Sequence, residues 1–161
     1  MSRIYTVPFR NSSFTTANGD YDFFELTPAD DRPIRLVGLF IGVKSEVGDA
    51  QEEMIDYSIV TDNATSGNGS AVTPKPVDPR DAAAGFTAEA VASTPASTGT
   101  AVEVHADTFN VRSGLQLWWP EINGQSTGPK VDQADTMLCV RLGTALADDA
   151  TISGTAYVEE L

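Results

Sequence analysis

The side chains best suited to acid–base or metal chemistry are scattered along this sequence. Its one histidine, His105, lies in the strand-like segment VEVHAD, and its one cysteine, Cys139, lies inside the apolar run MLCV. A transition-metal site of the zinc type needs several His or Cys ligands at defined spacings. We therefore expect a solvated strand histidine, an inert core thiol, no transition-metal site and no cofactor.

Carboxylates are abundant and often adjacent, at Asp30–Asp31, Glu52–Glu53, Asp148–Asp149 and Glu159–Glu160. A glycosidase needs two carboxyl groups facing one substrate, but neighbouring residues in a strand point to opposite faces. Solvated charge is therefore the expected role. Calcium held by loop oxygens at 45–53 or 148–150 stays open, although the D-x-[DN]-x-[DN]-G pattern is absent.

Motifs for nucleophilic catalysis and phosphate binding are absent from the sequence. It contains no G-x-S-x-G, G-x-G-x-x-G or P-loop pattern, and GQSTGPK at 124–130 has the wrong spacing for one. The formal net charge of −13, with only three lysines, argues against a nucleic-acid partner. We expect a protein that is not an enzyme.

Trp118 and Trp119 form the strongest aromatic feature. Trp119 follows Leu115 and Leu117 at strand spacing and is the candidate for the core. Trp118 shares the other face with Gln116. It could be a stacking platform for a sugar, an anchor in a protein interface, or a side chain packed under a loop.

The elements that must position these residues are strands. Short runs rich in β-branched and aromatic residues recur from end to end, bounded by Gly, Pro, Asn or Asp, and no window has helical spacing. The nine runs are 3–8, 20–26, 34–43, 53–61, 86–91, 100–107, 115–119, 136–142 and 152–160. They predict one all-β domain over 1–161, a single antiparallel β-sandwich with a jelly roll favoured and an immunoglobulin-type sandwich second.

The run at 34–43 is apolar on both faces, so we expect it to be central in its sheet or to meet a partner chain. Gly38 and Gly42 are placed on the same face as Ile34, where a ring or a backbone could approach closely. The amino terminus has no stretch of signal-peptide length, and no apolar run reaches 18 residues. No membrane partner and no secretion are therefore expected.

The segment 62–85 predicts one long irregular loop, because prolines at 74, 76 and 79 fix φ and remove backbone donors. One hypothesis is that it lies across a neighbouring subunit and buries apolar surface there; the other is that it packs on its own sandwich. The candidate partner-binding residues in this region are Pro74, Pro76, Pro79, Ala83 and Phe86.

Residues 1–10 are a second candidate interface, as a strand or arm. Residues 1–35 hold four arginines against five acidic residues, so this part of an acidic chain is nearly neutral. The candidate contacts are Arg3 and Arg10, together with Tyr5 and Phe9, which we expect to be exposed.

Several stretches together carry a family resemblance: RIYTVPFR, FELTPADDRPIRLVGL, SEVGDAQEE, SAVTPKPVDPRDAAAGFTAEA, WWPE and TISGTAYVEEL. Over nearly the whole chain, the sequence resembles small head-associated structural proteins of tailed bacteriophages and prophages, a group of capsid decoration (cement) proteins built on a β-sandwich. The resemblance implies synthesis in the host bacterial cytoplasm, a place on the virion capsid surface, and binding to the major capsid protein, usually as a homotrimer. The alternative is a virion-associated module that binds carbohydrate or a receptor.

Overall fold

The chain folds almost entirely into antiparallel strands. The computed structural model describes residues 2–44 and 53–161. Within them, the only helical element is a 3-10 turn, η1, at Thr16–Asn18. The strands are β1 Arg3–Phe14, β2 Asp22–Thr27, β3 Ile34–Val43, β4 Met54–Asn63, β5 Ser70–Val72, β6 Lys75–Pro76, β7 Thr87–Ala92, β8 Val102–Asn110, β9 Leu115–Trp118, β10 Glu121–Ile122, β11 Gln125–Ser126, β12 Lys130–Val131, β13 Met137–Leu142 and β14 Ala150–Glu160.

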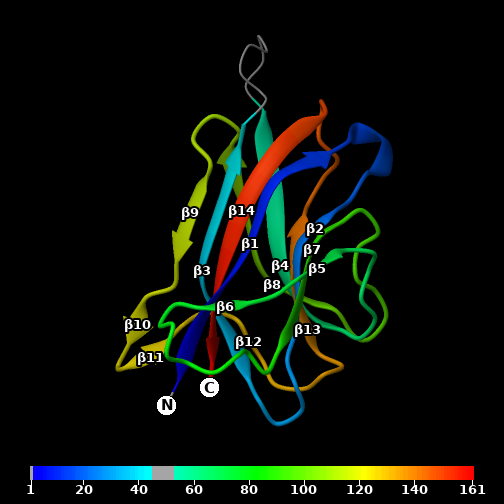
Figure 1. The fold of residues 1–161 in the computed structure, drawn as a ribbon. Coiled ribbons are helices and arrows are strands. Elements are labelled where there is room, and N and C mark those ends of the chain that lie inside the picture. Colours follow the sequence, from blue (N-terminus) through cyan, green and yellow to red (C-terminus); the bar gives the residue numbers. More distant parts are fainter. Residues whose placement is uncertain (1, 45–52) are drawn as a thin grey trace.

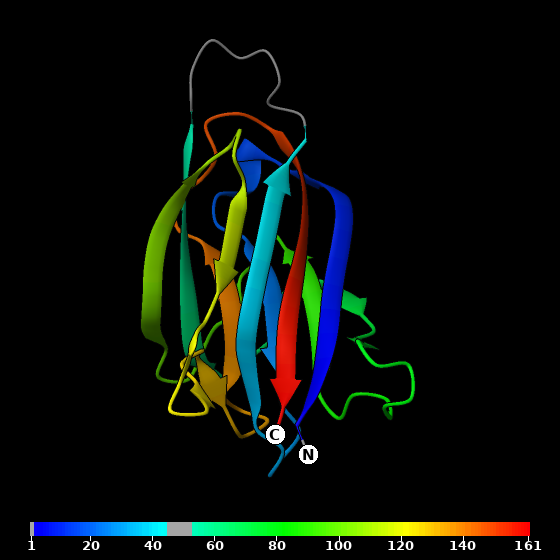
Figure 2. The same cartoon turned by 90° about the vertical axis from the view of Figure 1, so that its left-hand side faces the viewer.

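The strands form two six-stranded sheets that face each other (Figures 1 and 2). Sheet A has the order β12-β3-β14-β1-β6, with β9 also paired to β3, and sheet B has the order β5-β7-β2-β13-β4-β8. A separate hairpin joins β10 to β11. The predicted all-β, antiparallel class is confirmed, and each of the nine predicted runs contains a strand; the jelly roll stays a prediction.

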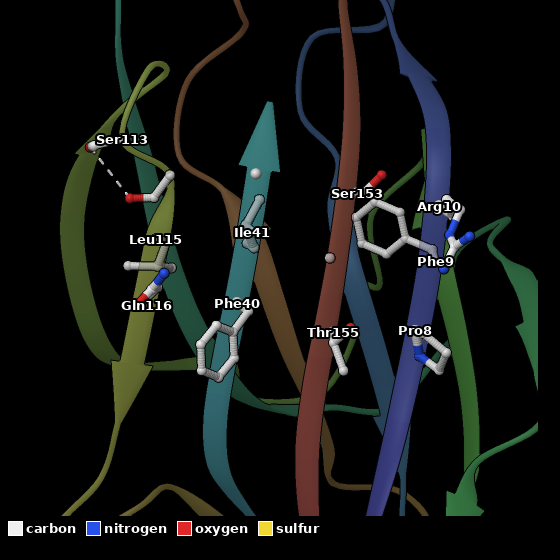
Figure 3. A pocket seen from close by; sticks show the side chains of 13 residues that line it. Pro8, Phe9, Arg10, Phe40, Ile41, Ser113, Leu115, Gln116, Ser153 and Thr155 are labelled. Atoms are coloured by element: carbon white, nitrogen blue, oxygen red, sulfur yellow. Dashed lines mark hydrogen bonds between the residues drawn. The ribbon is translucent and has the colours of Figure 1, made fainter. Parts of the chain in front are cut away.

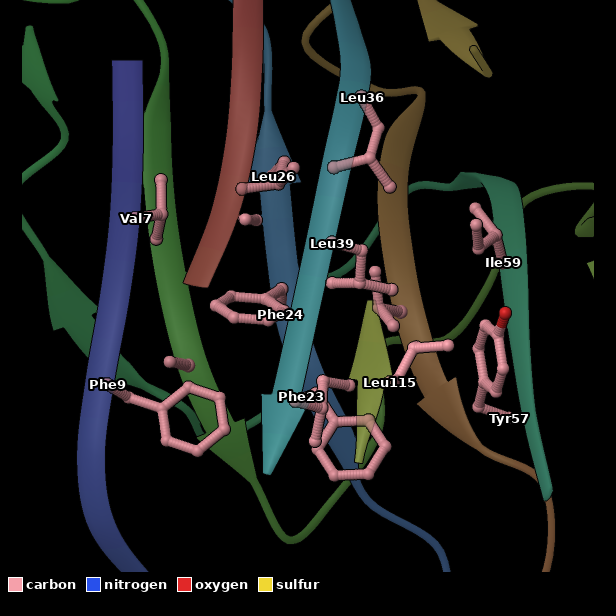
Figure 4. Packing of buried hydrophobic residues seen from close by; sticks show 14 of the residues in the cluster. Val7, Phe9, Phe23, Phe24, Leu26, Leu36, Leu39, Tyr57, Ile59 and Leu115 are labelled. Atoms are coloured by element: carbon pink, nitrogen blue, oxygen red, sulfur yellow. The ribbon is translucent and has the colours of Figure 1, made fainter. Parts of the chain in front are cut away.

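A single apolar core fills the space between the sheets (Figure 4). Sheet A contributes alternate residues of β1, namely Tyr5, Val7 and Phe9, while sheet B contributes Phe24 and Tyr57 among others. The expectation that Tyr5 and Phe9 are exposed is wrong, because their exposed fractions are 0% and 9%. Every second side chain of β1 points to the core, which buries these three residues. Arg3 and Arg10, at the two ends of the predicted segment, made the whole segment look exposed.

The predicted face of Gly38 is wrong, because β3 contains a bulge. Tyr157 of β14 pairs with Gly38, but the next residue, Val158, pairs with Leu36, so Val37 is an extra residue. The alternation therefore shifts after Leu36, as expected at a β-bulge. Ile34 and Leu36 point to the core, whereas the Cβ position of Gly38 points outward, opposite to the predicted side.

The segment 62–85 is more ordered than predicted, because it begins in β4 and contains β5 and β6. β5 pairs with β7 of sheet B, and β6 pairs with β1 of sheet A, so the segment links the two sheets along one side of the sandwich. The segment therefore packs on its own sandwich, and the hypothesis that it also lies across a neighbouring subunit stays a prediction. Only its outward side is available to a partner.

Phe86, at the end of this segment, is also placed differently from the expectation. Its exposed fraction is 3%, and its ring meets that of Tyr5 edge to face with centroids 5.7 Å apart. It therefore belongs to the protein's own core and does not contact a partner at the surface.

No helix in the described part of the chain has the length and apolar character needed to cross a membrane.

Candidate binding surfaces

The acidic residues do not assemble a metal site in the part of the chain that the structure describes, where no group of three or more His, Cys, Asp or Glu side chains could hold an ion. The calcium hypothesis at 45–53 falls almost entirely on residues 45–52, which lie outside the described residues. In the second candidate segment, Asp149 Oδ1 accepts a hydrogen bond of 2.8 Å from the Thr16 amide and so fixes a turn.

Glu159 and Glu160 point to opposite faces, as predicted for neighbours in a strand. Glu159 is 3.2 Å from the Arg35 guanidinium, whereas Glu160 accepts a 2.8 Å hydrogen bond from the amide of Gly85. Neither carboxyl group is placed to share one substrate with the other. The expectation of solvated charge is wrong for Glu160, whose exposed fraction is 7%. The pair stabilises two different parts of the fold.

His105 is half-buried and not simply solvated. Its Nε2 lies 3.1 Å from the Tyr57 hydroxyl, and its ring centroid lies 6.1 Å from that of Trp119. Burial, with a smaller contribution from Asp107, raises the pKa of Tyr57 to about 12. These contacts give His105 a packing role between β4 and the chain after β9.

Cys139 is buried, as predicted, with an exposed fraction of 0%. Burial raises the pKa of its thiol, which disfavours the reactive thiolate. The side-chain amide of Asn63 donates to its sulfur over 3.7 Å. The residue is structural.

Two buried acidic residues were missed by the sequence analysis. Asp22 has an exposed fraction of 0% and accepts hydrogen bonds from Arg141 Nε at 2.7 Å and from the Ala96 amide at 2.8 Å. Arg141 also donates to the Ala96 carbonyl oxygen at 2.8 Å. This cluster fixes the turn after β7 to the outer face of sheet B.

Glu25 fixes a second loop to the same face. Its carboxylate accepts hydrogen bonds from the Ser66 hydroxyl at 2.7 Å and from the Gly67 amide at 2.9 Å. The Ser66 oxygen is also 2.8 Å from Glu89, the residue opposite Glu25 in the β2–β7 pair. Burial raises the pKa of Glu25 above its ordinary value, although the bonds from Ser66 and Gly67 oppose the shift.

The structure joins the two predicted interface segments into one surface. β6 pairs with β1, the Val77 amide donates to the Ile4 carbonyl oxygen at 2.9 Å, and the Tyr5 hydroxyl donates to the Ala82 carbonyl oxygen at 3.1 Å. We call the exposed side chains of Ile4, Val77, Ala82 and Ala83 the arm surface. Ile4 and Val77 have exposed fractions of 43% and 57%.

The charges around the arm surface are largely paired. Arg80 binds Asp78 with nitrogen–oxygen distances of 2.8 and 3.1 Å, and Arg3 lies 3.8 Å from Asp81. A hollow of about 190 Å³ adjoins them. It is lined by Arg3, Arg32, Glu160 and Leu161. The predicted residues in or beside this surface are Arg3, Pro74, Pro76, Pro79 and Ala83, of which Pro74 and Pro76 are half-buried.

Trp118 and Arg10, the other two predicted contacts, lie on the outer face of sheet A. Strand pairing places two rows of residues across this face: Thr6, Tyr157, Gly38 and Trp118 in one, and Pro8, Thr155, Phe40 and Gln116 in the next. The Trp118 ring centroid is 5.0 Å from that of Tyr157 and 5.2 Å from that of Phe40. Trp118 has an exposed fraction of 56%, while Trp119 is half-buried against the core.

A depression of about 440 Å³ lies on the same four strands, β9, β3, β14 and β1 (Figure 3). Phe40 belongs both to its lining and to the aromatic cluster, whereas Trp118 contacts Phe40 from beside it. A Cβ atom at Gly42 would meet nothing within 4 Å, which accounts for the open space there. The polar side chains that line the depression are Arg10, Ser113, Gln116, Ser153 and Thr155.

Comparisons with known proteins leave the family open. No family model matches the chain, and no curated protein matches it. A weak structural likeness is found to the structure of infectious bursal disease virus Gx strain, with 16% identity and a TM-score of 0.21. It covers 100% of this chain and 42% of that one. A likeness of this size carries no argument about fold or function.

Proposed function

We propose that the protein is a non-catalytic structural protein of a phage virion that decorates the capsid by docking its arm surface on major capsid subunits. The sequence resemblance suggests the partner, the homotrimer and the virion location. The observation that carries the choice of surface is the pairing of β6 with β1, which holds the exposed apolar residues of both segments in one place.

Preorganisation favours this surface for docking. The prolines restrict the backbone, and the bonds to Ile4 and from Tyr5 hold the segment on the sandwich before any partner binds. Docking therefore costs little conformational entropy, which is a main expense of association. More of the free energy of apolar burial is therefore available as binding affinity.

The local charge balance also favours the arm surface as the docking surface. The chain carries a net charge of −13, but the ion pairs Arg3–Asp81 and Arg80–Asp78 locally balance the charges beside the arm surface. Large apolar side chains that are exposed within such a neutral patch are typical of protein contact surfaces. Acidic side chains elsewhere would keep the decorated particle soluble.

Co-sedimentation with capsids assembled without this protein tests the proposal. The informative variant is Ile4→Asp/Val77→Asp, since both side chains are already exposed and the charges should not disturb the core. Desolvating a carboxylate in an apolar contact is costly, so we expect capsid affinity to fall by about tenfold or more.

The matched control is Val104→Asp, which introduces the same charge at a residue with an exposed fraction of 47% on β8, the edge of sheet B. This variant should sediment with capsids as the unmodified protein does. Equal binding by all three proteins would rule out the arm surface, and binding by none of them would rule out decoration.

A further inference from the structure

We propose that the outer face of sheet A carries a glycan-binding groove, with Trp118 as its stacking platform and Gln116, Thr155 and Arg10 as its polar contacts. Capsid decoration does not require such a site, so this inference goes beyond the proposed function. Ile4 of the arm surface lies on the same face of sheet A, but no residue of the arm surface lines the groove.

The orientation of Trp118 is the first argument. Its six-membered ring lies directly over Gly38, where an added Cβ would be 2.5 Å from Cζ3 and 2.6 Å from Cε3. The ring is thus in contact with the sheet on one side, yet 56% of the residue is exposed. A flat, exposed indole ring held in place by Tyr157 and Phe40 suits stacking against the C–H face of a sugar ring.

The polar groups beside the ring are the second argument. Gln116 follows Phe40 and Thr155 in the row next to Trp118, and all three line the depression. Gln116 offers both donors and an acceptor, and Thr155 offers a hydroxyl. A concave site that combines aromatic surface with a few polar groups is typical of small-ligand recognition, whereas a protein docking face is flatter and more extended.

Charge narrows the ligand class. Among the residues that the structure describes, those lining the depression include Arg10 and no Asp or Glu, although the chain has a net charge of −13. Arg10 is exposed on β1, three strands from Trp118 on β9 and four residues along the strand from Thr6, the β1 residue in the Trp118 row. At the usual strand spacing and rise, the two residues are about 20 Å apart. The groove therefore fits an oligosaccharide with an acidic group at the Arg10 end.

A printed array carrying neutral, uronate-containing and sialylated oligosaccharides tests the inference, with titration calorimetry on the sugar that binds best. We expect binding that Trp118→Ala weakens by about tenfold or more, since the stacking surface is lost. Arg10→Gln should remove the preference for acidic over neutral sugars. The control Val104→Ala, on the far edge of sheet B, should bind like the unmodified protein.

Three results would overturn the inference: no binding to any sugar class on the array, sugar binding that survives Trp118→Ala, or loss of capsid binding or self-association in Trp118→Ala. The last would make this face a protein interface. Because Ile4 and Val77 are outside the groove, the co-sedimentation experiment with their variants fails or succeeds independently of this one.

Discussion

Trp118 and Gly38 are in such close contact that no other amino acid fits at position 38 with the ring in place. A Cβ atom there would be 2.5 Å from Cζ3 of the indole, far inside van der Waals contact. The glycine, made an outward-facing residue by the bulge at Val37, thus determines how the most exposed aromatic ring of sheet A lies on the sheet.

Gly38→Ala should therefore displace the Trp118 ring without unfolding the protein. The ring is at the surface and can move, and alanine is better than glycine in a strand by roughly 0.5–1 kcal/mol, which offsets part of the lost contact. We expect a changed near-ultraviolet circular dichroism spectrum with a melting temperature close to that of the unmodified protein. An unchanged spectrum would contradict the described packing.

Tyr5→Phe should loosen the segment that carries the arm surface. The Tyr5 hydroxyl donates to the Ala82 carbonyl oxygen at 3.1 Å, and such a bond contributes about 1 kcal/mol. Trypsin cleavage after the exposed Arg80 reports the loosening and should become faster. Tyr157→Phe, which removes a hydroxyl on the outer face of sheet A, is the control, and equal cleavage rates in the two variants would contradict the prediction.

Glu25→Gln should stabilise the protein at neutral pH. The Ser66 hydroxyl has one hydrogen but lies within 2.8 Å of both Glu25 and Glu89, so two ionised carboxylates leave one contact without a hydrogen. A glutamine removes the buried charge. Its amide nitrogen can donate to Ser66 when its oxygen takes the place of Oε1, which accepts from the Gly67 amide over 3.2 Å. At pH 7 we expect a higher melting temperature, by about 2–4 °C for each kcal/mol gained.

The advantage of Glu25→Gln should shrink as the pH falls. Burial raises the pKa of Glu25, so the folded state binds this proton more tightly than the unfolded state. The associated stabilisation is complete below the unfolded-state pKa and is lost as pH rises through the folded-state pKa. Thermal melts at pH 4, 5.5 and 7 measure the difference in melting temperature between Glu25→Gln and the unmodified protein. A difference that grows toward pH 4 would contradict the raised pKa of Glu25.

Arg141→Met should destabilise the protein strongly. It leaves the fully buried Asp22 carboxylate without its two guanidinium hydrogen bonds, and breaking a buried ion pair in this way costs about 3–5 kcal/mol. Urea unfolding measures the loss. Asp22→Asn/Arg141→Met removes both charges and should recover part of it; a loss below about 1 kcal/mol in the single variant would mean that the cluster contributes little.

The strands were predictable because their signal is local. Apolar runs and the turn residues that bound them identify the positions of β3, β4 and β13 to within two residues at each end. The register of β3 was not predictable, since the bulge at Val37 depends on its pairing with β14. That single extra residue reversed the predicted side of Gly38.

The candidate surfaces were predictable only in part. The prolines at 74 and 76 conceal β6, because a two-residue edge strand can tolerate a proline that an inner strand would not. Nothing local shows that this segment lies on β1 and buries Tyr5 and Phe86. The exposure of Trp118 followed from alternation along β9, but its contacts with Phe40 and Tyr157 come from two other strands.

The partners of Asp22 and Glu25 were equally hidden. Both acids lie in the run DYDFFEL, where they look like solvated residues of a half-buried strand. Their donors, Arg141 and Ser66, are far away in sequence and meet them only when sheet B and its covering loops are assembled.

The measurement that most directly tests capsid decoration by the arm surface is a cryo-electron microscopy map of capsids assembled without this protein and then saturated with it. The account predicts copies at a fixed lattice position, with Ile4 and Val77 against the major capsid protein and the groove beside Trp118 turned to solvent. Bare capsids, or copies that touch the shell through Trp118, would contradict it.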